Sequence, residues 1–233
     1  MITLRPTDER GHIDHGWLDA RHSFSFGRYV DRAHMGFGPL RVINEDRVAP
    51  GAGFATHPHE NMEIITYVLE GALRHDDSTG GGGVLRRHDV QAMTAGAGIT
   101  HSEKNASTTD ALRLIQIWIM PREDGLPPAY ADRRFDPGPA EGRLQTLASP
   151  DGRNGSLVIN QDATLSRVFL DPGESVPLTI ENGRRLWVQA VAGSADLAGA
   201  GVSAGDGAHS ETPGEITLSA GEQGLEALIF DLP

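Results

Sequence analysis

The sequence predicts an all-β protein of sandwich or jelly-roll type, with little helix. Short apolar runs recur along the chain at short spacing, and none sustains a 3.6-residue period over a dozen positions. The 29 glycines and 14 prolines are scattered between these runs and are not gathered in one tract. Such a texture is typical of many short strands that are joined by tight turns.

The expected strands are the segments in which apolar and β-branched residues dominate. They include residues 40–44, 62–69, 83–85, 90–94, 112–120, 156–159, 166–170, 185–191 and 225–230. The alternating "SFSF" within residues 20–29 predicts a further strand, with Phe24 and Phe26 on one face in core or edge packing. "DDSTGGGG" at 76–83 predicts a hairpin turn, because a phosphate loop would need a following helix and a lysine.

The stretch 120–144 is rich in proline and charge, and we interpret it as a connector between two domains. The expected domains are residues 1–135 and 145–233, built as two tandem jelly-roll barrels. A shift of 122 residues places Pro50-Gly51 on Pro172-Gly173 and Gly71 on Gly193. The same shift places His57 on Thr179 and His59 on Glu181. The pattern indicates a duplicated scaffold whose second copy lacks the histidines.

Composition excludes several classes of function. The formal net charge of −12 disfavours direct binding of nucleic acid, and the absence of cysteine excludes thiolate metal sites and cysteine nucleophiles. The polar start of the chain lacks the apolar core of a signal peptide, and no apolar stretch approaches a membrane span. We therefore expect a cytoplasmic protein that is not bound to a membrane.

Two pairs of residues, each containing histidine, are the candidate metal ligands in the sequence. His57 and His59 stand two residues apart ahead of an apolar run, and His101 and Glu103 form a second pair with the same spacing. Residues i and i+2 of a strand point to one face, so both pairs converge if their strands meet across a barrel. Three imidazoles and one carboxylate suit iron, manganese, nickel, copper or zinc, and leave an octahedral metal two open positions.

The remaining titratable residues have plainer interpretations. Glu63 lies four residues beyond His59 and is either an alternative ligand or, as we favour, a partner that orients a ligand. His75, His88 and His209 stand in loop-like contexts and are expected to be solvated. No arrangement of serine, histidine and aspartate indicates a hydrolase.

These residues also carry a family resemblance. The segment from Gly51 to Glu63 resembles the first cupin motif, and "GAGITHSEKN" resembles the second, with Gly96 where many cupins have proline. Together, "RHSFSFG", "HPHENMEIITYVLEG" and "MTAGAGITHSEKN" more specifically resemble the pirin family. The C-terminal part resembles, more loosely, the second cupin domain of the shorter bacterial pirin-like proteins.

The resemblance implies a bicupin that binds metal in its N-terminal barrel alone. The family's ligands map onto His57, His59, His101 and Glu103, and the metal implied is Fe(II), while manganese, nickel, copper and zinc stay open. The activity implied is that of quercetin 2,3-dioxygenase, in which a flavonol and dioxygen give a depside and carbon monoxide. Glu103 would be the general base for the flavonol hydroxyl as well as a ligand.

Two alternatives stay open. Pirins also resemble non-enzymatic transcription cofactors, which bind iron, sense its redox state and act through protein partners. A further alternative is another cupin reaction, such as an isomerisation. An acidic rim without an apolar pocket would favour the regulator, whereas a deep apolar cleft above the metal would favour the enzyme.

Overall fold

The computed structural model describes residues 1–136 and 144–233, and nearly all of its regular structure is strand. Two short 3-10 turns accompany the strands, η1 (Thr7–Glu9) and η2 (Arg153–Gly155). Among the described residues, no helix has the length and apolar character that crossing a membrane requires. The chain forms two compact units. The N-terminal unit comprises residues 11–136 and 157–161, and the described residues of the C-terminal unit are 1–10, 144–156 and 162–233.

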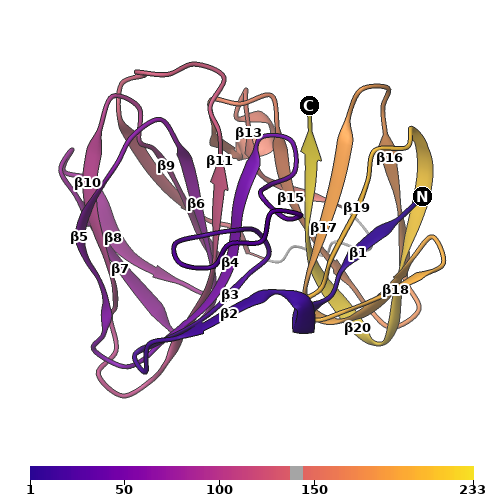
Figure 1. Ribbon diagram of the computed structural model, residues 1–233, viewed down its shortest axis with the longest axis horizontal. Helices are drawn as coiled ribbons and strands as arrows, with labels where there is room; N and C mark the ends of the chain where they lie inside the picture. The colour runs from indigo at the N-terminus through magenta and orange to yellow at the C-terminus, as the bar shows by residue number, and fades with distance from the viewer. Residues whose placement is uncertain (137–143) are drawn as a thin grey trace. The chain divides into compact units, whose positions relative to one another are not determined.

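The N-terminal unit is a jelly roll of two antiparallel sheets. The larger sheet holds β2 (Gly11–Asp14), β3 (Leu18–His22), β4 (Leu40–Val48), β6 (Glu63–Glu70), β9 (Asp89–Thr94), β11 (Leu112–Ile119) and β12 (Ala129–Arg134). Their order is β12-β9-β6-β11-β4-β3-β2. The smaller sheet holds β5 (Gly53–His59), β7 (Ala72–Asp77), β8 (Gly82–Arg86) and β10 (Ile99–Asn105), in the order β5-β10-β7-β8. Within this unit the two sheets face each other as separate layers (Figure 1).

The space between these two sheets is apolar at one end and polar further along. Leu18, Val48, Val68 and Leu114 belong to one buried cluster, and they come from four strands of the larger sheet. Strand residues alternate between the two faces of a sheet, so the positions two and four residues from this cluster along each strand also point inward. The N-terminal unit also includes the short strand β14 (Leu157–Val158).

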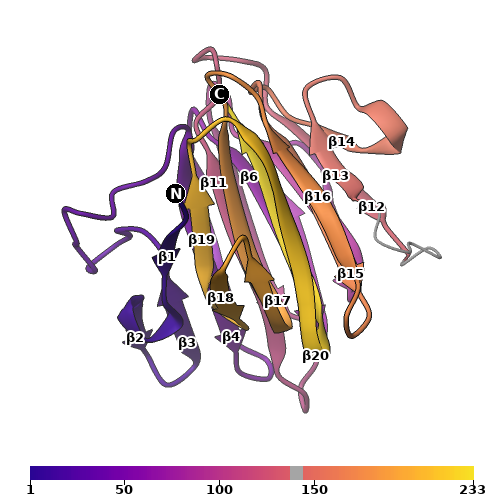
Figure 2. The same cartoon turned by 90° about the vertical axis from the view of Figure 1, so that its right-hand side faces the viewer.

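The C-terminal unit is built around two long strands. Its strands are β1 (Thr3–Arg5), β13 (Gln145–Ser149), β15 (Thr164–Leu170), β16 (Ser175–Ile180), β17 (Arg185–Leu197), β18 (Ala200–Ser203), β19 (Gly207–Ser210) and β20 (Gly214–Leu232). The order β1-β19-β17-β20-β15-β13 forms its sheet, and β16 also pairs with β20 and β18 with β17. The pairing of β17 with β20 contains two register shifts, between Ala190 and Ala192 and between Gly193 and Ala195. These bulges let the long strands, seen in Figure 2, bend around an apolar core.

The two units share local geometry at the positions that the 122-residue shift aligns. Gly51 and Gly173 have φ of 69° and 80°, and Gly71 and Gly193 have φ of 79° and 76°. Such values favour glycine, so each pair marks the same kind of turn. The shift also carries β5 onto β16 and the start of β6 onto the start of β17. These matches support the duplication that the sequence indicates.

All of the expected strands overlap observed ones, but two expectations are wrong in detail. Residues 20–29 do not form one strand: β3 ends at His22, and the chain continues into a loop with an isolated bridge between Phe26 and Tyr29. The expected connector 120–144 includes β12, which pairs with β9 in the larger sheet. Polar residues dominate β12, so its sequence shows no clear alternation of apolar and polar residues that would predict a strand. The predicted boundary between 135 and 145 falls largely on residues 137–143, which lie outside the described residues.

Candidate metal centre

The two histidine-containing pairs lie on neighbouring strands of the smaller sheet. β5 and β10 pair antiparallel, with His57 opposite His101 and His59 opposite Ile99. The sequence led us to expect two strands that meet across a barrel, but the strands are adjacent and share a ladder of hydrogen bonds. Convergence of the imidazoles is therefore fixed by strand register.

A bulge in β5 directs its histidines inward. Glu103 pairs with Phe54 and His101 pairs with His57, so two steps along β10 correspond to three along β5. Phe54 packs against the apolar cluster between the sheets, and its ring lies 5.3 Å from that of Trp17. The extra residue places His57 on this same inner side, although the two positions differ in parity.

The imidazoles of His57, His59 and His101 form a compact group. One ring nitrogen of each lies within 4.8 Å of the others, and the Nε2 atoms of His57 and His101 are 3.1 Å apart. The Nδ1 atom of His57 lies 2.7 Å from the carbonyl oxygen of Ala55. A carbonyl only accepts, so Nδ1 carries the proton and Nε2 of neutral His57 presents a lone pair to the group.

Burial keeps two of these imidazoles neutral. Desolvation, followed by the charge of His57, lowers the pKa of His59 from 6.5 to about 4. Desolvation also lowers the pKa of His101 to about 4, against the opposing influence of Glu103. Neutral imidazole is the form that binds metal, so His59 and His101 are in their ligating state at neutral pH.

The donor set fits a divalent transition metal. Two nitrogen ligands at about 2.1 Å from a metal and at a right angle to each other are about 3 Å apart. The Nε2 atoms of His57 and His101 have this separation. His101 Nδ1 is buried and has no hydrogen-bond partner among the described residues.

Glu103 lies beside His101, in a second group that also contains His75. Its Oε1 accepts hydrogen bonds from Gln91 Nε2 at 2.6 Å and from Thr66 Oγ1 at 3.2 Å, and its Oε2 accepts one from Gln116 Nε2. Burial tends to raise the pKa of Glu103, but His75, His101 and Thr66 outweigh it and lower the pKa. The carboxylate is therefore ionised, and neutral donors from the opposite sheet hold it in place.

His75 is a residue whose place the sequence did not reveal. We expected it to be solvated, but its side chain is fully buried on β7, and its Nε2 lies 3.2 Å from Asp77 Oδ2. The ring stacks on Tyr130 at 4.5 Å and lies 5.1 Å from the ring of His101. The signal that could have found it is alternation, since Leu73 and His75 are both inward positions of one strand.

Glu63 is not brought to the histidines. β5 ends at His59, Asn61 adopts a φ of 49°, and β6 begins at Glu63, so the strand does not continue as the same-face argument assumed. The Glu63 carboxylate accepts hydrogen bonds from Thr94 Oγ1 at 3.0 Å and from Asn160 Nδ2 at 3.3 Å. Glu63 belongs to neither potential metal-binding group among the described residues.

An aromatic cavity opens onto the three histidines. Its volume is about 640 Å³. Aromatic and apolar walls surround the polar groups, and they come from Trp17, Phe26, Phe54, Ile64 and Trp118. The Trp118 ring packs edge-on against His59 at 4.9 Å and against Phe26 at 5.2 Å. Phe24 is buried as expected, but Phe26 lines this cavity, a role that we had considered less favourable than packing.

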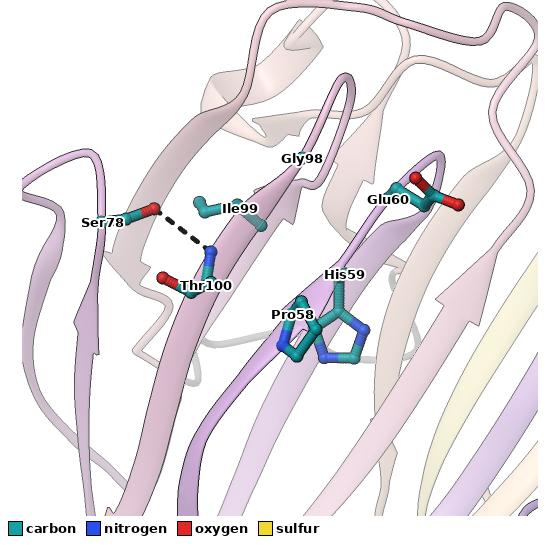
Figure 3. A pocket seen from close by; sticks show the side chains of 7 residues that line it. All are labelled: Pro58, His59, Glu60, Ser78, Gly98, Ile99 and Thr100. Atoms are coloured by element: carbon teal, nitrogen blue, oxygen red, sulfur yellow. Dashed lines mark hydrogen bonds between the residues drawn. The ribbon is translucent and has the colours of Figure 1, made fainter.

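Two further hollows border this cavity or its histidines. A smaller cavity of about 360 Å³ shares Trp17, Phe26, Phe54, Asn44 and Asp46 with the main one. A shallower hollow, drawn in Figure 3, is lined in part by His59, Ser78 and Thr100, and the Thr100 amide donates to the Ser78 hydroxyl at 3.1 Å. His59 thus borders both the main cavity and this outer hollow.

Comparison with known proteins assigns the chain to a family. The model of the pirin family matches residues 3–119, and a model described as the quercetinase C-terminal cupin domain matches residues 146–232. The chain belongs to the pirin family. Both matches together confirm the predicted bicupin, with one cupin domain in each part of this pirin.

Relatives of this pirin match over its full length. The quercetin 2,3-dioxygenase of Escherichia coli K12 is 47% identical over 233 residues, which cover 100% of this chain and 99% of the relative. A pirin-like protein of Caulobacter vibrioides is 39% identical over 98% of this chain and 99% of its own. The crystal structure of the bacterial pirin YhhW of Escherichia coli in complex with nickel(II) has a TM-score of 0.95 at 46% identity, and covers 100% of this chain and 99% of that one.

Proposed function

We propose that this pirin is a metal-dependent quercetin 2,3-dioxygenase. In that reaction a flavonol and dioxygen give a depside, and the ring carbon that carries the 3-hydroxyl leaves as carbon monoxide. The observation that carries the proposal is the group of three imidazoles that borders an aromatic-walled cavity of about 640 Å³, with the buried carboxylate of Glu103 beside His101. The full-length relatives named for this activity support it.

His57, His59 and His101 would hold the metal, and Glu103 would complete the set. A bound divalent metal supplies Lewis-acid stabilisation of the deprotonated 3-hydroxyl and the electronic means to use dioxygen. The ligand chemistry accepts Fe(II), manganese, nickel, copper or zinc, and a relative binds nickel(II) in its crystal structure. Among these metals we propose Fe(II) on the family resemblance.

The cavity suits a flat aromatic substrate. Its volume lies within the range of small-molecule sites, about 300–1,000 Å³. Phe26 and Trp118 offer aromatic surface beside His59, which favours stacking or edge contacts with a planar ring system.

Glu103 would receive the proton of the 3-hydroxyl. Its lowered pKa keeps it ionised, so it is available as an acceptor before substrate binds. Both of its oxygens already accept hydrogen bonds from Gln91, Thr66 and Gln116. Of the roughly four lone-pair sites of the carboxylate, these hydrogen bonds use two on Oε1 and one on Oε2, which leaves a site on Oε2 for the metal or the proton.

The deep aromatic cavity is the feature that separates the enzyme from the alternative of a regulator acting through protein partners. The regulator would be favoured by an acidic rim and no apolar pocket, whereas five aromatic or apolar side chains line this site. We therefore propose the enzyme alone, with a flavonol-like aromatic compound and dioxygen as its partners.

The test is turnover of quercetin in air by protein loaded separately with each of the five metals. Loss of flavonol absorbance and release of carbon monoxide are followed together. The double variant His57→Ala, His59→Ala should lose both bound metal and turnover. The control is Thr179→Ala, Glu181→Ala, which changes the equivalent positions of the C-terminal unit and should retain both. No turnover with any of the five metals would refute the proposal.

A further inference from the structure

A row of polar side chains crosses the inner face of the larger sheet of the N-terminal unit. Strand register places its members directly opposite one another on five neighbouring strands, from β3 to β9. The row runs through His22, Asn44, Gln116, Thr66 and Gln91. The residues are buried, so each polar atom in the row needs a partner.

Two glutamines of the row hold Glu103 in the same manner. Gln91 and Gln116 each direct Nε2 at the carboxylate. An ionised carboxylate only accepts hydrogen bonds, so this contact fixes which end of each amide is nitrogen and which is oxygen. The amide oxygens of both side chains must therefore face other groups.

The two amide oxygens have different surroundings. Gln91 Oε1 accepts a hydrogen bond from the Tyr130 hydroxyl at 3.3 Å. Gln116 Oε1 is buried and has no hydrogen-bond partner among the described residues. Gln116 is only 7% exposed and lines the main cavity, whereas Gln91 does not line it. An unpaired buried acceptor is costly, and a donor that enters the cavity beside Gln116 would satisfy it.

We propose that Gln116 recognises a phenolic hydroxyl of the bound ligand, which donates to its amide oxygen. The inference rests on the proposed function, which gives the class of ligand, a planar polyphenol. It adds the residue that selects such ligands by their hydroxyl groups. Carbonyl and ether oxygens of such a ligand cannot serve, because they only accept. A polyphenol that lacks this hydroxyl leaves the amide oxygen unpaired. Leaving a buried polar group unpaired is the strongest way for a site to discriminate against an analogue.

The test uses flavones, which lack the 3-hydroxyl and so are not cleaved by the proposed reaction. Binding of luteolin, chrysin and unsubstituted flavone is followed through fluorescence of Trp17 and Trp118, which line the cavity. The wild-type protein should bind luteolin about tenfold or more tightly than flavone. The step of the series at which affinity rises identifies the ring that carries the recognised hydroxyl.

Gln116→Met should reduce the difference in affinity between luteolin and flavone to within about twofold, whereas Gln91→Met should retain the full difference. The second variant is the matched control, since it also removes an amide donor from Glu103. Gln116→Asn, which withdraws the amide by one methylene, serves if the methionine variant does not fold. An unchanged difference in the Gln116 variants, equal binding of the three flavones by wild type, or no binding would overturn the inference. Hydroxyl-dependent binding of luteolin without quercetin turnover would refute the proposed reaction alone.

Discussion

β5 of the N-terminal unit and β16 of the C-terminal unit are equivalent strands with different interiors. β16 pairs with β20 in unbroken register, and Val176, Leu178 and Ile180 enter the apolar core by strict alternation. β5 contains a bulge, so Phe54 and His57 face the interior although they differ in parity. The same scaffold therefore carries a group of imidazoles in one unit and an apolar wall in the other, and a single extra residue in the pairing decides which side chains point inward.

The larger sheet of the N-terminal unit and the sheet of the C-terminal unit show the same contrast at equivalent positions. In the N-terminal unit Asn44, Gln116 and Thr66 stand opposite one another. In the C-terminal unit the corresponding register holds Ser166, Ile229 and Val188. Where the smaller sheet contributes a buried carboxylate, the larger sheet supplies donors. Where the interior is apolar, as in the C-terminal unit, the sheet contributes mostly apolar side chains, because an unpaired donor there would be costly.

The largest expected effect comes from moving one imidazole by a single residue. The double variant Thr56→His, His57→Thr keeps the composition of β5 but places the imidazole where an unbulged strand would face inward. Because the bulge directs position 57 to the group, metal retention should fall to that of His57→Ala. Bound metal per chain after dialysis is the measurement. Retention equal to wild type would show that the bulge does not set the site.

Truncating a buried side chain of β16 should destabilise the C-terminal unit, whereas truncating the equivalent side chain of β5 should have little effect on stability. Leu178→Ala removes a side chain that is 2% exposed, and should reduce the free energy of unfolding of its unit by about 2–5 kcal/mol. Thr56→Ala, at the equivalent and exposed position of β5, should change stability by less than about 0.5 kcal/mol. Urea unfolding followed through Trp187 and through Trp17 with Trp118 separates the two units. Equal costs would remove the contrast between the two strands.

The smallest expected effect is a pH dependence confined to the metal-free N-terminal unit. The folded-state pKa of His101 is about 4 against an ordinary 6.5, so between these values the unfolded chain binds a proton that the folded unit excludes. Stability should therefore fall as the pH decreases from 6.5 towards 4, by about 2 kcal/mol for His101 alone at pH 5. Urea unfolding of chelator-treated protein at pH 7.5 and pH 5 measures it in a Trp187→Phe background. His101→Gln should reduce the difference between the two pH values, and an unchanged difference in this variant would contradict the assignment.

The sequence alone predicted the fold class and the candidate ligands, because both depend on local periodicity, and it indicated the duplication through glycines and prolines that repeat after 122 residues. Alternation and glycine-rich turns predict strands, and spacing of i, i+2 places His57 with His59 and His101 with Glu103 on common faces. Such regularities can be recognised from residues that are close together in the sequence. They carry through to the structure wherever a strand continues without interruption.

Only the tertiary structure decided how these groups are held. The donors to Glu103 come from 37 residues before it at Thr66 and from 13 residues after it at Gln116, and no local pattern links them. The bulge of β5, the burial of His75 and the entry of Phe26 into the cavity likewise depend on pairing and packing between distant segments. The sequence alone determined which residues alternate. The register between strands decided which of them meet, because cross-strand contacts are set by the whole sheet and not by any one strand.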